Sequence, residues 1–203
     1  MRHAELRLRS GAPTKVSPIR AGRARVAWLV LLCALLVSGG APPSEPHPTA
    51  ARSAGPLVFT EARVSQVLYR LNSGLGAPQR ERIAAAVVRY SNKYELDPAL
   101  VLAVISREST ARPWVRSAKG AVGLMQVMPY MQGPLLVAGN LTHVESNIEA
   151  GCMILADNIH RLGERRGISA YFWGNDVRDG RYFEAVQAAR TRIRREAATS
   201  QAG

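Results

Sequence analysis

The sequence predicts an all-α fold formed by one helical domain over residues 57–195. Apolar side chains in this region recur three or four residues apart, which places them on one face of an α-helix. No stretch alternates apolar and polar residues for long enough to predict a β-strand. The chain has 203 residues and is 47% hydrophobic, which is enough for one domain with a buried core.

Five helices account for this periodicity, and local signals mark several of their ends. The first helix is expected after Thr60, and the segment 73–78 (SGLGAP) separates it from the second. Asp97 followed by Pro98 is a favourable N-cap and first-residue pair for the third helix. The fourth helix is expected to end at Gly163. The apolar positions that define the five helices are Val64, Val67, Leu68 and Leu71; Ile83, Val87, Tyr90 and Tyr94; Leu100, Val101, Val104 and Ile105; Ile148, Cys152, Leu155, Ile159 and Leu162; and Tyr182, Val186, Ala189 and Ile193.

The N-terminus predicts export. Residues 1–40 hold seven Lys or Arg and one Glu, and their apolar run 26–37 (VAWLVLLCALLV) is followed by small residues. This is the layout of a secretory signal peptide, and the apolar run is shorter than the roughly 20 residues that span a bilayer. We predict a cleaved signal peptide or a retained signal anchor over 1–40, a Pro-rich linker over 41–56 and a polar tail over 196–203. The membrane would be contacted only through an uncleaved signal.

The basic residues are unevenly distributed. The formal net charge is +12, and about half of it lies in residues 1–40. Two explanations stay open for the remaining excess: a solvated basic face, or attraction to an anionic polymer or membrane surface. No basic run interleaved with aromatic residues is present, so nucleic-acid binding is not expected. The four histidines lack metal-ligand spacing, and neither a metal nor another cofactor is expected.

One carboxylate falls on an apolar helix face. Glu108 follows Val104 by four residues and Val101 by seven, so it shares their side of the third helix. Desolvation there would raise its pKa toward the range that a general acid needs near neutral pH. The alternative is a glutamate at a helix end that reaches water or pairs with Arg107 or Arg112. Periodicity alone does not separate the two interpretations.

The residues that follow Glu108 form a motif. Segment 108–129 (ESTARPWVRSAKGAVGLMQVMP) contains Glu-Ser, a Ser about nine residues after the Glu, a Gly-Ala pair, and Gly-Leu-Met-Gln-x-Met-Pro. This pattern resembles, without gaps, the catalytic motif of the soluble lytic transglycosylase family, which has a goose-lysozyme-like fold. Segments 94–105, 147–151 and 170–174 are similar to flanking motifs of that family. The resemblance covers about residues 80–187 and implies a single lysozyme-like domain. The motif positions are Glu108, Ser109, Ser117, Gly120, Ala121, Gly123, Leu124, Met125, Gln126, Met128 and Pro129.

The resemblance implies that Glu108 is the single catalytic carboxylate. It would protonate the glycosidic oxygen between N-acetylmuramic acid and N-acetylglucosamine and then deprotonate the C6 hydroxyl, with help from the sugar's acetamido group. The product would be a 1,6-anhydromuramyl end. Between Glu108 and Glu145 the sequence has no Asp or Glu, which argues against a two-carboxylate hydrolase built on this loop. Distant carboxylates such as Asp157 could still fold back toward Glu108.

The resemblance also assigns substrate-facing roles on the loop. Ser117 and Gln126 would bind the glycan around the cleavage point. Gly123 would let the backbone approach the sugar closely, because glycine has no Cβ. Met125 and Met128 would enclose the carboxylate in apolar surface and keep water away from it.

Two neighbouring aromatic positions complete the expected site. The resemblance implies that the phenol of Tyr171 hydrogen-bonds the carboxyl of Glu108. At the next position the family has Asn, whereas this chain has Phe172. Two explanations stay open for Phe172: core packing, or a subgroup with altered substrate binding or partners.

The expected function is therefore a peptidoglycan lytic transglycosylase in the periplasm or exported to the cell envelope. The alternatives are a lysozyme-like hydrolase that uses water, and a weakly active peptidoglycan-binding accessory of an assembly. Glycan strands are the expected partner. Small single-domain members of the family often serve envelope secretion or conjugation machines, so such a complex is a candidate second partner.

Overall fold

The computed structural model describes residues 57–131 and 139–199 of the chain. The predicted signal (1–40) and Pro-rich linker (41–56) lie outside the described residues and stay predictions. Within the described ranges, no helix is both long enough and apolar enough to cross a membrane.

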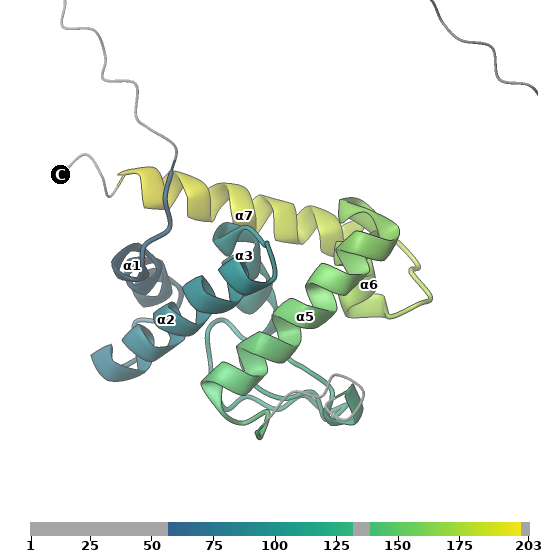
Figure 1. Cartoon of the computed structure of the whole chain (residues 1–203), viewed down its shortest axis with the longest axis horizontal. Helices are drawn as coiled ribbons and strands as arrows, with labels where there is room; N and C mark the ends of the chain where they lie inside the picture. The colour runs from purple at the N-terminus through teal and green to yellow at the C-terminus, as the bar shows by residue number, and fades with distance from the viewer. Residues whose placement is uncertain (1–56, 132–138, 200–203) are drawn as a thin grey trace, which may run out of the picture. The chain divides into compact units, whose positions relative to one another are not determined.

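These two ranges form six α-helices and one short 3-10 turn, and they contain isolated bridges but no β-strand (Figure 1). The all-α prediction is thus confirmed, and all five predicted helices are present. Thr60 and Asp97 act as N-caps, accepting hydrogen bonds from the backbone N–H groups of Arg63 and Ala99. The elements are α1 (Glu61–Leu71), α2 (Ala77–Lys93), α3 (Pro98–Glu108), η1 (Pro129–Met131), α5 (Val144–Leu162), α6 (Glu164–Trp173) and α7 (Arg181–Thr199).

Helix α3 forms the centre of the core. Every residue from 99 to 105 is buried, because α3 packs against both α7 and α2. Helix α5 packs against α2 and α6, and Figure 1 shows α7 (yellow) running across α3. A helix buried on all sides has little freedom to shift, so its last residue, Glu108, is positioned by the core.

Helix α6 was not predicted from the periodicity, and α7 is longer than expected. Gly163, with φ of 75°, turns the chain between α5 and α6. Gly167 then lets α6 lie against α5, because a Cβ there would lie 2.6 Å from the Cα of Ile159. A short helix with a weak apolar pattern is stabilised mainly by such packing. Helix α7 continues to Thr199 and buries Ala197, so the helical unit extends beyond the predicted boundary at 195.

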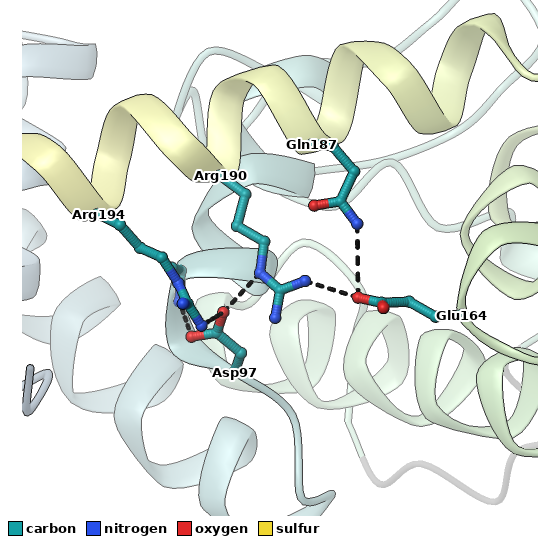
Figure 2. Close-up of polar contacts among 6 residues, drawn as sticks. Asp97, Glu164, Gln187, Arg190 and Arg194 are labelled. Atoms are coloured by element: carbon teal, nitrogen blue, oxygen red, sulfur yellow. Dashed lines mark hydrogen bonds and ion pairs between the residues drawn. The ribbon is translucent and has the colours of Figure 1, made fainter. Parts of the chain in front are cut away.

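An ion-pair network joins α3, α6 and α7 (Figure 2). The carboxylate of Asp97 accepts from Arg190 Nε at 2.6 Å and Arg194 Nη2 at 2.7 Å, and Arg190 Nη1 also donates to Glu164 at 2.6 Å. Burial by itself would raise the pKa of Asp97. The hydrogen bonds from Arg194, Arg190 and the Ala99 N–H outweigh burial and hold that pKa below its ordinary value. The network fixes the position of α7 along α3.

The substitution Asp97→Asn should lower the free energy of unfolding by about 2 kcal/mol near neutral pH, because it leaves the part-buried Arg190 with only the exposed Glu164 as counter-charge while keeping an N-cap. A carboxylate whose pKa is lower in the folded state stabilises above its unfolded-state pKa of about 3.9. That stabilisation is lost as pH falls through the folded-state value. Urea unfolding across this range measures the effect. A loss in the free energy of unfolding that stays constant in acid would contradict the assignment.

The control is Glu184→Gln, which breaks the exposed pair with Arg165 and should cost less than about 1 kcal/mol.

Candidate active site

Glu108 is the last residue of α3 and is partly buried. The next residue, Ser109, is buried, and its hydroxyl donates to the carbonyl oxygen of Leu124 at 2.7 Å. That hydroxyl also lies 3.2 Å from the carbonyl oxygen of Ile105, one turn back in α3. These contacts tie the loop of residues 109–131 to the end of α3. The carboxylate and the motif that follows it in sequence are therefore held together in space.

A tyrosine from α7 holds the carboxyl of Glu108. The Tyr182 hydroxyl donates to Glu108 Oε1 at 2.5 Å. Burial raises the pKa of Glu108, and the Tyr182 hydrogen bond and the charge of Arg107 reduce this rise without cancelling it. Burial and the nearby Glu108 hold the pKa of Tyr182 well above its ordinary value, so the phenol keeps its proton. The desolvation predicted for Glu108 is confirmed, and the arrangement suits a general acid.

The loop is held from α5 by one buried amide. Asn147 is 1% exposed. Its Nδ2 donates to the carbonyl oxygens of Val122 at 2.8 Å and Leu141 at 3.0 Å, and its Oδ1 accepts from the Met125 N–H at 2.8 Å. Within the loop, Val122 and Val127 exchange two backbone hydrogen bonds of 3.0 Å. The loop conformation therefore depends on a side chain that lies outside the loop.

Ser117 and Gln126 both make hydrogen bonds that shape the loop. Ser117 Oγ accepts from the Ala121 N–H at 3.0 Å. Gln126 Nε2 donates to the carbonyl oxygens of Val115 at 3.1 Å and Gly123 at 2.9 Å. These bonds leave the Ser117 hydroxyl proton and Gln126 Oε1 for the contacts with a glycan that the sequence predicts.

The structure corrects the predicted roles of Met125 and Gly123. Met125 is fully buried and packs so closely on α5 that a Cβ on Gly151 would lie 2.5 Å from its Sδ. A side chain without exposed surface does not contact a glycan, although this burial is compatible with the predicted enclosure of Glu108 by Met125. Gly123 is also buried, and a Cβ there would lie 2.5 Å from Asn147 Nδ2. Glycine is required at this position by the amide of Asn147, and no sugar needs to approach it.

A matched pair of glycines tests this explanation. Gly123 and Gly120 both have positive φ, 78° and 91°, but a Cβ on Gly120 would meet nothing within 4 Å. Both substitutions to Ala should cost about 1 kcal/mol for the left-handed backbone. Gly123→Ala should cost about 2 kcal/mol more, because it also displaces the buried amide. Urea unfolding measures the difference, and equal losses in the two variants would rule out the contact with Asn147 as the reason.

The structure also corrects the role of Tyr171. Its hydroxyl donates to the carbonyl oxygen of Met125 at 2.8 Å, so the phenol bound to Glu108 is that of Tyr182. Burial, followed by the nearby charge of Glu108, holds the pKa of Tyr171 well above its ordinary value. Tyr171 therefore lies close to the carboxyl but supports the loop backbone.

A cavity of about 720 Å³ lies between the loop, α5 and the end of α6. Of the predicted substrate-binding residues, Gln126, Met128 and Tyr171 line it. Phe172 also lines it and is 55% exposed, so core packing does not explain this residue. At the same wall, Trp173 Nε1 is enclosed and has no hydrogen-bond partner among the described residues.

Two residues at the site, Tyr182 and Asn147, are placed by the fold without a local signal in the sequence for their partners. Tyr182 was assigned to an apolar helix face, and its pairing with Glu108 across 74 positions gave no local signal. Asn147 was included in a segment similar to the family, although no role was given to it. Asn147 lies beside Ile148 and one helical turn before Gly151, on the side of the helix that faces the core. A polar side chain in such a position indicates a buried amide with a specific hydrogen-bond partner.

Comparison with known proteins decides the family. The model of the Transglycosylase SLT domain matches residues 86–192, just over half of the chain. This chain belongs to the Transglycosylase SLT family. Glu108, the loop and Tyr182 all lie within the matched SLT region. A transglycosylase of Enterobacteria phage PRD1 is 38% identical over 97 residues, which is 47% of this chain and 35% of that protein. The chain thus spans about a third of this relative's length.

Solved structures with similarity to the SLT domain include two lytic transglycosylases. An inactive mutant of Slt from Pseudomonas aeruginosa is 22% identical, with a TM-score of 0.40 over 55% of this chain and 22% of that one. The 70 kDa soluble lytic transglycosylase from Escherichia coli is also 22% identical, with a TM-score of 0.44 over 66% of this chain and 25% of that one.

Proposed function

We propose that this chain is a peptidoglycan lytic transglycosylase with Glu108 as its catalytic residue. The observation that carries the proposal is the carboxyl of Glu108, which burial keeps protonated to higher pH and which receives a hydrogen bond from Tyr182. It lies at the end of a buried helix, and the cavity of about 720 Å³ is lined by Tyr171, which lies near Glu108, and by Phe172, which stacks on Tyr182. Membership of the SLT family supports this chemistry.

The proposed reaction needs one carboxyl that acts twice. Glu108 donates its proton to the glycosidic oxygen between N-acetylmuramic acid and N-acetylglucosamine as the C1–O bond breaks. The muramyl acetamido group supports the positive charge at C1. The carboxylate then takes the proton of the muramyl C6 hydroxyl, and that oxygen bonds to C1. Glu108 ends protonated, as it began, and the 1,6-anhydro product forms without consuming water.

A hydrolase that uses Asp157 as a second carboxylate is the rival reaction. Asp157 lines the cavity, which is the observation in its favour. Its side chain is 60% exposed and is paired with Arg161 at 2.8 Å, so it lacks the apolar enclosure that Glu108 has. Such a carboxylate in open solvent is poorly placed to activate one water beside a sugar.

Mass spectrometry of digested sacculi separates the two reactions. The full chain should release muropeptides that are one water lighter than those released by a hydrolase. The Asp157→Asn variant should release the same anhydro products. Hydrated ends, lost in Asp157→Asn, would establish the hydrolase. Binding to sacculi without release of any product would leave the chain as a peptidoglycan-binding accessory.

We further propose that the protein acts in the periplasm or cell envelope, where its substrate lies. The signal-like residues 1–40 support export, and an envelope secretion or conjugation complex is the candidate partner. Fractionation of cells that carry the tagged full chain tests the location. Recovery with the cytoplasmic fraction would contradict it.

A further inference from the structure

Phe172 lies between the cavity and the phenol that contacts Glu108. Its ring stacks on the ring of Tyr182, with centroids 5.0 Å apart and planes 17° from parallel. The ring of Trp173 meets it edge-on at 5.0 Å and 87°. Because Phe172 is 55% exposed and lines the cavity, it is not held there by burial in the core. Its defined contacts are with the two other aromatic rings.

Tyr182 needs support of this kind. It is the second residue of α7 and follows the non-helical segment 174–180. The first turn of a helix has fewer internal hydrogen bonds than its middle. A tyrosine side chain rotates about two torsions, χ1 and χ2. Because the hydroxyl lies far from the Cα–Cβ bond, a small change in χ1 is enough to turn a good hydrogen bond into a poor one. A flat ring stacked on the phenol restricts that rotation.

We propose that Phe172 is a positioning residue, which through its stacked contact holds the Tyr182 hydroxyl on Glu108 and so sets the protonation and orientation of the acid. The proposal rests on the proposed function for its kinetic consequences, but the contact itself can be tested without catalysis. It assigns a role to the position where this chain departs from the Asn of its family.

Besides its burial, two groups among the described residues shift the pKa of Glu108. Tyr182 contributes a hydrogen bond from α7, and Arg107 contributes a positive charge from α3 itself. Tyr171 of α6 lies close enough for its own pKa to respond to the Glu108 charge. The Tyr182 hydrogen bond stabilises the carboxylate form. Its loss therefore raises the pKa of Glu108, whereas the effect of Arg107 stays the same.

The kinetic test compares kcat and KM on purified sacculi across pH. A general acid must be protonated, so activity falls as pH rises through the pKa of Glu108. In Phe172→Ala and in Tyr182→Phe, this alkaline limb should move to higher pH, and kcat should fall about tenfold, as for one lost hydrogen bond to a charged group. Phe172→Tyr keeps a flat ring and should restore the wild-type limb, whereas Phe172→Leu should not.

The pairwise test is the double variant Phe172→Ala with Tyr182→Phe. If Phe172 acts through Tyr182, the double variant should be no slower than Tyr182→Phe alone, because the hydrogen bond from the Tyr182 hydroxyl to Glu108 is already absent in that variant. Tyr69→Ala is the matched control. Tyr69 is also 55% exposed but lies on α1 against Arg80, and its loss should leave both the pH limb and kcat unchanged.

A carboxyl titration in the absence of substrate tests the contact independently of catalysis. The ¹³C resonance of Glu108 should titrate at higher pH in Phe172→Ala and Tyr182→Phe than in the wild type and Tyr69→Ala. An unchanged titration in Phe172→Ala would overturn the proposal. So would a rise in KM with an unmoved pH limb, which would make Phe172 a sugar contact only. If the wild type releases no product while the titrations shift as expected, the proposed function fails and the positioning role stands.

Discussion

The substitution Glu108→Gln is expected to reduce the digestion of sacculi by about 1,000-fold or more. One carboxyl is proposed both to donate the proton to the leaving oxygen and to accept the proton of the C6 hydroxyl, and each transfer contributes about 10²-fold or more. Glutamine has the same shape and can still accept the hydrogen bond from Tyr182, so the fold should be kept. Release of soluble anhydro-muropeptides, measured by mass spectrometry, gives the rate.

Stability should change in the opposite direction in the same variant. The pKa of Glu108 is higher in the folded state than in the unfolded chain, so at neutral pH ionisation of this carboxyl favours unfolding. The neutral amide of Glu108→Gln removes this cost, and the melting temperature should rise. Glu184→Gln is the matched control, because Glu184 lies on the surface in an exposed pair with Arg165. Its rate of digestion and its melting temperature should both stay near those of the wild type. A variant Glu108→Gln that still digests sacculi would show that another group is the acid.

The substitution Asn147→Ala is expected to lower the free energy of unfolding by about 4 kcal/mol, because three hydrogen bonds to backbone partners are lost and, among the described residues, only Val122 keeps another bond, from the Val127 N–H. Those partners are the carbonyl oxygens of Val122 and Leu141 and the Met125 N–H. A loss of this size is a large part of the 5–15 kcal/mol that stabilises a typical domain. Activity should fall as well, because the loop that contains Gln126 is no longer held against α5.

Urea unfolding of Asn147→Ala beside Asn92→Ala separates the role of this amide from the general effect of removing an asparagine. Asn92 is exposed on α2, and its replacement should cost less than about 0.5 kcal/mol. Equal losses in the two variants would show that the loop does not depend on Asn147. Hydrogen exchange of the Met125 amide gives a local measure, since its protection should be lost in Asn147→Ala alone.

Local signals in the sequence predict the helical class and five of the six described helices. Apolar periodicity and helix caps are local properties, so they predict the start of α1 after Thr60 and the N-cap at Asp97 where the structure has them. The spacing of Glu108 from Val101 and Val104 places it on their apolar face, and the resemblance of the motif that follows favours a desolvated carboxylate over one that reaches water. The motif after it determined the family, which the match over residues 86–192 confirmed.

The side chains that surround Glu108 are set by the packing of the helices. Tyr171 and Tyr182 are both tyrosines on the apolar side of a helix, and only the packing of α6 and α7 against the loop determines which phenol contacts Glu108. The same holds for Gly123, whose missing Cβ leaves room for Asn147. Spacing along a helix defines the face on which a residue lies, but its partner across the core is set by helix packing, which brings together residues far apart in the sequence.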